Sequence, residues 1–190
     1  MRELEYNCDM AAATTGLKIT YDLRKVPPDP DRYELINGEI VESATPDVEH
    51  QRGTGRLFRR LADHVEQHDL GEVLIGPCHV VLDADTRLDP DIMFISKDRF
   101  SIVKPEHVAG APDLVVEVTS EWTRMIDRLV KRDRYLEFGV QEYWLLDPFE
   151  PRLEVRRPEG TKYRVVAEFG PGDTIESLTF PGLRIPVSSL

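Results

Sequence analysis

The sequence lacks the features that mark secreted, membrane-spanning and disulfide-stabilised proteins. Its 190 residues include only two cysteines, Cys8 and Cys78, which is too few for a disulfide framework or a four-cysteine zinc site. No apolar run approaches the roughly 20 residues that a membrane helix needs. Residues 1–16 show no basic segment followed by an apolar one, so they do not read as a signal peptide. We therefore expect a cytoplasmic protein with no membrane contact.

Positive charge is also scarce. The chain has 24 Lys and Arg residues against 35 Asp and Glu residues, which gives a formal net charge of −11. This balance argues against non-specific coating of nucleic acid, because such binding rests on neutralising phosphates. Local basic groups remain, and both a solvated face and a phosphate-contacting face fit them. They are Arg52, Arg56, Arg59 and Arg60 in one segment, and Arg124, Arg128, Lys131, Arg132 and Arg134 in another.

The chain has the length of one domain. We expect residues 1–17 to form a flexible tail, in which Met10 is a second candidate start of translation, and residues 18–190 to form a single domain. Apolar residues at helical spacing predict a helix over 47–68 that Gly71 stops, and a second helix is predicted over 121–139.

Short β-branched and apolar runs predict the strands. Asn37-Gly38 predicts the turn of a hairpin within residues 33–43. Further strands are predicted at 73–76, 78–83, 90–96, 113–120 and 141–147, with a loop over 97–112 and a trailing meander at 152–157, 162–169 and 173–180.

The order of these elements predicts the fold class. The strand–helix–strand unit at 113–147 has the length of a crossover between parallel strands, whereas the other strands follow one another directly, as antiparallel strands do. We therefore predict an α/β (α+β) fold, a mixed β-sheet flanked by α-helices, with an extra N-terminal hairpin and extra C-terminal strands.

Glu117 is the most unusual residue of the predicted sheet. Alternation along strand 113–120 places it on one face with Val115 and Thr119, in the middle of an apolar run. An ionised carboxylate is costly there unless it is paired or bound to a metal. The pattern allows three interpretations: an ion pair with a nearby arginine, an exposed face of an edge strand, and a metal site.

Two further residues complete a candidate site. Asp91 opens the strand at 90–96, and neighbouring strands could bring it beside Glu117, where a divalent cation would relieve their repulsion. Lys131 lies four residues after Asp127 on the predicted helix. The two could form a surface ion pair, or the helix could aim Lys131 at the carboxylates, where an ammonium can contact a phosphate.

Several separated segments resemble the Uma-two family ("putative restriction endonuclease"), a branch of the PD-(D/E)XK nuclease superfamily. They are YELINGEIVES (33–43) followed by Pro46 and His50, LDPDIMFIS (88–96), GAPDLVVEVTS (110–120) followed by Asp127, Lys131 and Tyr135, and GVQEYWLLDP (139–148). The resemblance covers residues 18–150. It implies a restriction-endonuclease-like fold and a bacterial, Mg²⁺-dependent endonuclease that hydrolyses phosphodiester bonds of nucleic acid, DNA in the first place.

The same resemblance implies residue roles. Asp91 corresponds to the Asp of the PD motif and Glu117 to the acidic residue of E-x-K, while Thr119 stands where the superfamily has a lysine, so Lys131 is the expected substitute. Asp91, Glu117 and the backbone carbonyl of Val118 would hold Mg²⁺ or Mn²⁺. The supporting candidates are Glu39, His50, Asp113, Thr119 and Asp127, whereas Tyr135 is interpreted as a packing residue.

Each supporting candidate also has a plainer interpretation. His50 could make one local hydrogen bond at the start of its helix, Asp113 could cap a turn, and Glu39 could face solvent. The missing lysine at 119 and the net charge keep a second function open, a non-catalytic interaction module on a degenerate nuclease scaffold. Exposed edges among strands 152–180 make a homodimer a further candidate.

Overall fold

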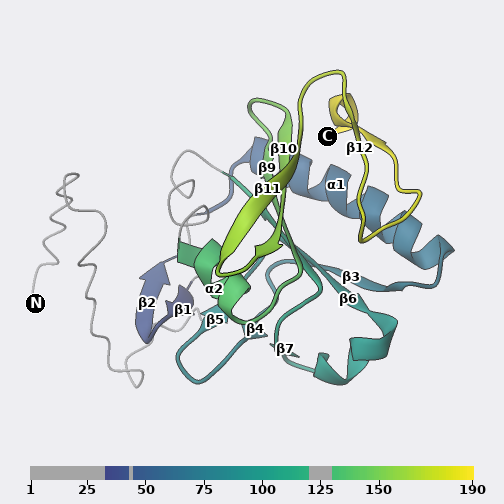
Figure 1. Ribbon diagram of the computed structural model, residues 1–190. Coiled ribbons are helices and arrows are strands. Elements are labelled where there is room, and N and C mark those ends of the chain that lie inside the picture. The colour runs from purple at the N-terminus through teal and green to yellow at the C-terminus, as the bar shows by residue number, and fades with distance from the viewer. Residues whose placement is uncertain (1–32, 43–44, 120–129) are drawn as a thin grey trace, which may run out of the picture.

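The computed structural model describes residues 33–42, 45–119 and 130–190 (Figure 1). The predicted tail and Asp127 lie outside these ranges. The helices are α1 (Val48–Gln67), α2 (Arg132–Glu137) and the short 3₁₀ helices η3 (Lys97–Ile102) and η5 (Val187–Ser189). The strands are β1 (Tyr33–Ile36), β2 (Glu39–Glu42), β3 (Gly71–Ile75), β4 (Val80–Val81), β5 (Arg87–Leu88), β6 (Ile92–Ser96), β7 (Val108–Ala109), β8 (Leu114–Val118), β9 (Glu142–Asp147), β10 (Arg152–Glu159), β11 (Lys162–Phe169), β12 (Thr174–Ile175) and β13 (Ile185–Pro186).

A six-stranded mixed sheet in the order β11-β10-β9-β8-β6-β3 forms the centre of the fold. Within it, β8 and β9 run parallel, and the other neighbours are antiparallel. The crossover expected over 113–147 and the mixed sheet are therefore confirmed. Ile92 of β6 lies opposite Val116 of β8. Because these strands are antiparallel, Asp91, which precedes Ile92, and Glu117, which follows Val116, lie at the same end of the two strands.

Two layers cover the faces of this sheet (Figure 1). On one face, α1 and the C-terminal segment pack against the even-numbered residues of β8, with Leu57, Leu61 and Val116 in one buried cluster. On the other face, α2 and β1 pack against its odd-numbered residues. A second sheet in the order β2-β1-β5-β4-β7 borders that second face. The layers confirm that Glu117 belongs to the face of Val115.

Local sequence explains the elements that border the candidate site. Asn37 and Gly38 both adopt positive φ values, 55° and 76°, as the turn of a two-residue hairpin requires. The Asp47 side chain caps α1 by accepting a hydrogen bond from the His50 backbone N–H at 2.8 Å. These two sequence signals fix where β1 turns back and where α1 begins.

Other expectations were wrong in detail. Helix α1 ends at Gln67, and Gly71 opens β3 instead of stopping the helix. The loop expected over 97–112 contains η3 and β7, and of the strand expected over 173–180 only Thr174–Ile175 forms one, paired with the unpredicted β13. In the part of the chain that the structure describes, no helix is long and apolar enough to cross a membrane.

Candidate active site

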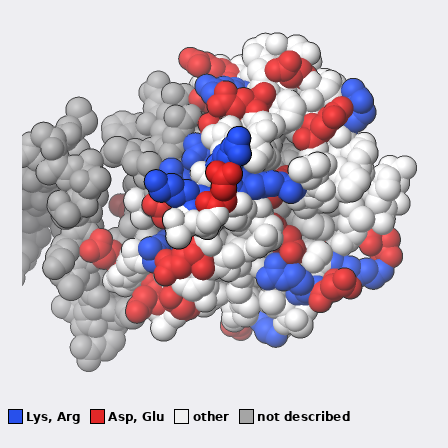
Figure 2. Space-filling view, in the orientation of Figure 1, with Lys and Arg blue, Asp and Glu red and all other residues white. Residues whose placement is uncertain are grey.

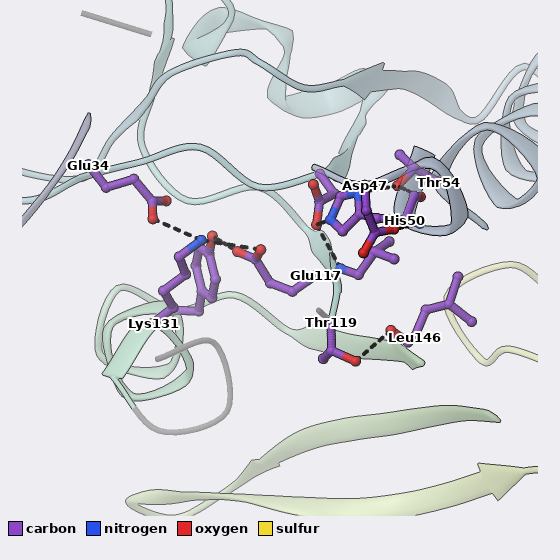
Figure 3. A network of polar contacts seen from close by, with 11 residues as sticks. Glu34, Asp47, His50, Thr54, Glu117, Thr119, Lys131 and Leu146 are labelled. Atoms are coloured by element: carbon purple, nitrogen blue, oxygen red, sulfur yellow. Dashed lines mark hydrogen bonds and ion pairs between the residues drawn. The ribbon is translucent and has the colours of Figure 1, made fainter. Parts of the chain in front are cut away.

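Glu117 lies in the interior, where β8, α2 and the first hairpin meet. Its side chain is 2% exposed and points towards the start of α2 (Figure 3). Glu117 Oε2 lies 3.3 Å from Lys131 Nζ, and Glu117 Oε1 accepts a hydrogen bond of 2.6 Å from the Tyr135 hydroxyl. A buried carboxylate is tolerated where such partners replace water. Of the three interpretations allowed by the sequence, the structure contains an ion pair, with a lysine as the partner.

Glu34 of β1 approaches the same lysine from the opposite side. Its Oε2 lies 2.9 Å from Lys131 Nζ, and its side chain is 4% exposed. The other oxygen, Oε1, accepts a hydrogen bond of 2.8 Å from the backbone N–H of Asp89. Lys131 therefore lies between two buried carboxylates that belong to different sheets (Figure 3).

Asp91 lies at the edge of the sheet, with different neighbours. Its Oδ2 accepts a hydrogen bond of 2.7 Å from the Val118 backbone N–H and lies 3.3 Å from His50 Nε2. The side chain is 22% exposed, and its Oδ1 has no hydrogen-bond or ionic partner within the described ranges. Val118 follows Glu117 directly in the chain. The peptide unit that joins them is therefore next to both carboxylates: its N–H donates to Asp91, and its carbonyl belongs to Glu117.

His50 is held by the first turn of α1. The Thr54 hydroxyl donates to the His50 carbonyl at 2.8 Å and lies 3.5 Å from His50 Nδ1. With a proton on Nε2, the imidazole can donate to Asp91, while Thr54 faces its other nitrogen. Helix α1 thus places a titratable ring beside the carboxylate at the sheet edge (Figure 3).

Tyr135 has a polar role in addition to the packing role expected from the sequence. It is fully buried among apolar residues, and its ring centroid lies 5.8 Å from that of Tyr143. Burial raises the pKa of the Tyr135 hydroxyl well above its usual value, and the charges of Glu117 and Glu34 raise it further. The phenol therefore stays protonated and donates to Glu117 throughout the physiological pH range.

The other predicted residues do not converge on this cluster. Asp113 lies at the opposite end of β8, where it accepts from the Ser96 N–H and pairs with Arg99. Thr119 is buried, and both its N–H and its hydroxyl donate to the Leu146 carbonyl. Glu39 lies opposite Ile36 in the hairpin, and within the described residues it has no hydrogen bond or ion pair with Lys131 or Glu117.

Sequence reasoning missed Glu34, and it named Glu39 from the same hairpin instead. A signal was present, because Glu34 and Ile36 share one face of β1 and Ile36 is apolar and buried. That alternation marks Glu34 as facing the interior. The hydroxyl contact of Tyr135 also had a signal, since a buried tyrosine hydroxyl usually has a hydrogen-bond partner and Tyr135 lies four residues after Lys131, on the same face of the predicted helix.

The cluster is not a complete set of metal ligands. Within the described residues, no three His, Cys, Asp or Glu side chains are gathered closely enough to hold a metal ion. The donor chemistry nevertheless suits Mg²⁺, which proteins commonly bind through one or two carboxylates while several waters remain. Asp91 fits this chemistry, because its side chain is partly exposed and its Oδ1 has no partner among the residues that the structure describes.

Comparisons with known proteins match most of the chain. Residues 20–188 match the model of the family described as "Uma2: Putative restriction endonuclease". The fold is similar to that of a crystal structure described as a putative nuclease belonging to DUF820 from Anabaena variabilis, with a TM-score of 0.71 and 20% sequence identity over 87% of this chain and 93% of that chain. None of the curated proteins compared with the chain matches it. The fold is thus the restriction-endonuclease-like mixed α and β fold expected from the sequence.

Proposed function

Because this chain belongs to the Uma2 family of "putative restriction endonucleases", we propose that it is a metal-dependent nuclease that hydrolyses phosphodiester bonds of nucleic acid, DNA in the first place. One observation carries the proposal. Lys131, on a different element from the superfamily's usual lysine, lies 3.3 Å from Glu117, and Asp91 adjoins the next peptide. This geometry supports Lys131 as the substitute for the lysine missing at position 119.

Asp91, Glu117 and the Val118 backbone carbonyl are the groups that would hold Mg²⁺ or Mn²⁺. Such an ion supplies Lewis-acid chemistry, lowering the pKa of a water and neutralising charge on the scissile phosphate. Hard oxygen donors of this kind favour these two ions over soft metals. We expect an ion and a substrate to approach from the side of Asp91, because the Asp91 side chain is more exposed than the Glu117 side chain.

Lys131 and His50 have distinct parts in the proposed reaction. The Lys131 ammonium, a compact charge with three donors, would stabilise the negative charge that develops on the phosphoryl group. The His50 imidazole, in contact with Asp91, could move a proton at Nε2 and orient the carboxylate. Both are held by the ends of helices, so their positions are set by the fold.

Exposed basic residues of α1 form the candidate surface for substrate phosphates. The face shown in Figure 2 carries Lys and Arg side chains beside Asp and Glu side chains, and its described residues form no continuous basic patch. The clearest basic stripe is on α1, beyond His50, and it consists of the exposed residues Arg52, Arg56, Arg59 and Arg60. We propose that this stripe contacts phosphates, which position the substrate without specifying its sequence.

The second candidate function is a non-catalytic interaction module on the same scaffold. One observation favours it: no three ligand side chains are gathered for a metal within the described residues. In that case Lys131 is a structural counter-ion of Glu34 and Glu117 and not a catalytic group. The two candidates differ in whether the protein binds a divalent cation at Glu117.

Calorimetric titration with Mn²⁺ separates them. We expect the wild type to bind Mn²⁺ and Glu117→Gln to bind it at least about tenfold more weakly, because the amide keeps the shape but loses the charge. Glu106→Gln, an exposed site with the same charge change, is the control and should bind as the wild type does. Absence of Mn²⁺ binding, or equal binding by wild type and Glu117→Gln, would support the interaction module.

A further inference from the structure

Glu34 connects three segments that each carry part of the site. It lies on β1, its Oε1 accepts from Asp89 two residues before Asp91, and its Oε2 pairs with Lys131. One buried carboxylate therefore links the hairpin, the segment that leads into β6 and the start of α2. A second contact joins the same hairpin to α2, because Arg134 donates to the Asn37 side chain at 2.8 Å.

We propose that Glu34 is a positioning residue of the catalytic centre: it holds Lys131 against Glu117 and fixes the segment that carries Asp91. This inference rests on the proposed nuclease function. Glu34 acts through Lys131 and the chain before Asp91, and it needs no contact with the substrate. The first hairpin is then part of the catalytic unit and not an appendage to the sheet.

The hydrogen-bond chemistry of Glu34 makes its carboxylate hard to replace. Its Oε1 accepts from the Asp89 backbone N–H, and its Oε2 accepts from the Lys131 ammonium. Glutamine has one acceptor oxygen and one NH₂ group, so in either orientation it can satisfy only one of these donors and turns a donor towards the other. Glu34→Gln therefore breaks the link at one of its two ends while it conserves the size of the side chain.

Charge balance connects Glu34 to the cation site. In their ionised forms Glu34, Glu117 and Asp91 carry three negative charges, and Lys131 carries one positive charge. Removal of the Glu34 charge makes this cluster less negative, so the binding of a divalent cation at Asp91 and Glu117 should weaken.

A double-mutant cycle tests the proposal with the full-length protein. The variants are Glu34→Gln, Lys131→Met and their combination, with Glu42→Gln as the control because Glu42 is an exposed glutamate of the same hairpin. The readouts are Mn²⁺ affinity by calorimetry and the kcat and KM for Mn²⁺-dependent hydrolysis of bis(p-nitrophenyl) phosphate, a phosphodiester without sequence.

We expect Glu34→Gln to lower kcat at least about tenfold with KM within about twofold, and to weaken Mn²⁺ binding about fivefold or more. In the Lys131→Met background the same substitution should change kcat by less than about twofold, since the residues act as one unit. Glu34→Asp keeps the charge and both acceptors, and it should stay closer to the wild type. It also serves if Glu34→Gln does not fold, as judged by circular dichroism.

The outcomes are distinct. If the wild type neither binds Mn²⁺ nor hydrolyses the diester, the proposed function fails. If the wild type does both and Glu34→Gln behaves like Glu42→Gln, only the role of Glu34 is overturned. Equal kcat losses in the two backgrounds, or equal losses for Glu34→Asp and Glu34→Gln, would also overturn it, because the effect would then depend on neither Lys131 nor the charge.

Discussion

The two carboxylates of the site stand at the same edge of adjacent strands but in opposite surroundings. Glu117 is 2% exposed and has a lysine and a tyrosine hydroxyl as partners, one on each oxygen. Asp91 is 22% exposed, and both of its contacts use Oδ2. One carboxylate is part of the interior, and the other is open to a ligand on one oxygen.

This difference shows that two carboxylates of one site can serve different purposes, one in stability and one in ligand binding. The partners of Glu117 stabilise the fold as well as the site, because a buried charge that loses its partner is expensive. Asp91 can change its partners at lower cost, since water can replace them. Substitutions around Glu117 should therefore lower stability as well as ligand binding, whereas substitutions at Asp91 should act mainly on ligand binding.

The largest effect is expected at Lys131. Lys131→Met keeps the length of the side chain but removes the ammonium from between the buried carboxylates of Glu34 and Glu117, which should lower the free energy of unfolding by about 3–5 kcal/mol. Urea-induced unfolding measures the loss. Lys104→Met is the control, because its exposed side chain donates to the Ser101 carbonyl and not to a buried carboxylate, and it should change stability by less than about 0.5 kcal/mol. Equal stability of the two variants would contradict the comparison.

An intermediate effect is expected at Tyr135. Tyr135→Phe removes the donor to a buried carboxylate oxygen and should cost about 1–3 kcal/mol at pH 7. Tyr163→Phe is the matched variant, since its hydroxyl donates to the uncharged Val140 carbonyl, and its cost should be smaller. Urea unfolding in the presence of a chelator compares the two variants.

The pH dependence of Tyr135→Phe sharpens this test. The folded-state pKa of Tyr135 is raised above its unfolded value near 10, so its contribution to stability is complete below that pH and is lost as the pH rises towards the folded-state pKa. The stability gap between wild type and variant should narrow above pH 10 by about 1.4 kcal/mol per pH unit. A gap that stays constant from about pH 8 to 11 would contradict the raised pKa.

The smallest effect on stability is expected at Asp91. Asp91→Asn keeps an acceptor for the Val118 N–H, so the free energy of unfolding should change by less than about 1 kcal/mol. Mn²⁺ affinity should nevertheless fall at least about tenfold, because the more accessible anionic ligand is lost. Asp98→Asn, an exposed change in η3, controls for net charge. A large loss of stability with unchanged Mn²⁺ binding would reverse the comparison.

Local patterns in the sequence were sufficient for the elements that frame the site. The Asn37-Gly38 turn, the Asp47 cap and the alternation along β8 each rest on interactions within a few residues, and all three are present. The strand expected over 173–180 failed because Phe180 packs into the core beside Trp144 after only Thr174–Ile175 have paired. Such packing of distant segments overrides local strand propensity.

The sequence likewise predicted some residues of the candidate site and not others. Position in a strand marked Asp91 and Glu117 as unusual. Lys131 was suggested by its place on the predicted helix and then by the family resemblance. Periodicity could not reveal which residue faces Lys131 from another sheet, because that depends on how the hairpin docks on α2. Alternation along β1 marks Glu34 as facing the interior, but its part in the site follows from its contacts with Asp89 and Lys131.

The link between the first hairpin and α2 also bears on how the molecule folds. The hydrogen bond from Arg134 to Asn37 closes a loop of 97 positions, and the ion pair of Glu34 with Lys131 joins the same two elements. Closing so long a loop costs entropy that is recovered only when the intervening strands have already collapsed. We expect this junction to form late, so that a partly synthesised or truncated chain would contain the carboxylates without their arrangement. Assembly of the site would then mark the completion of folding.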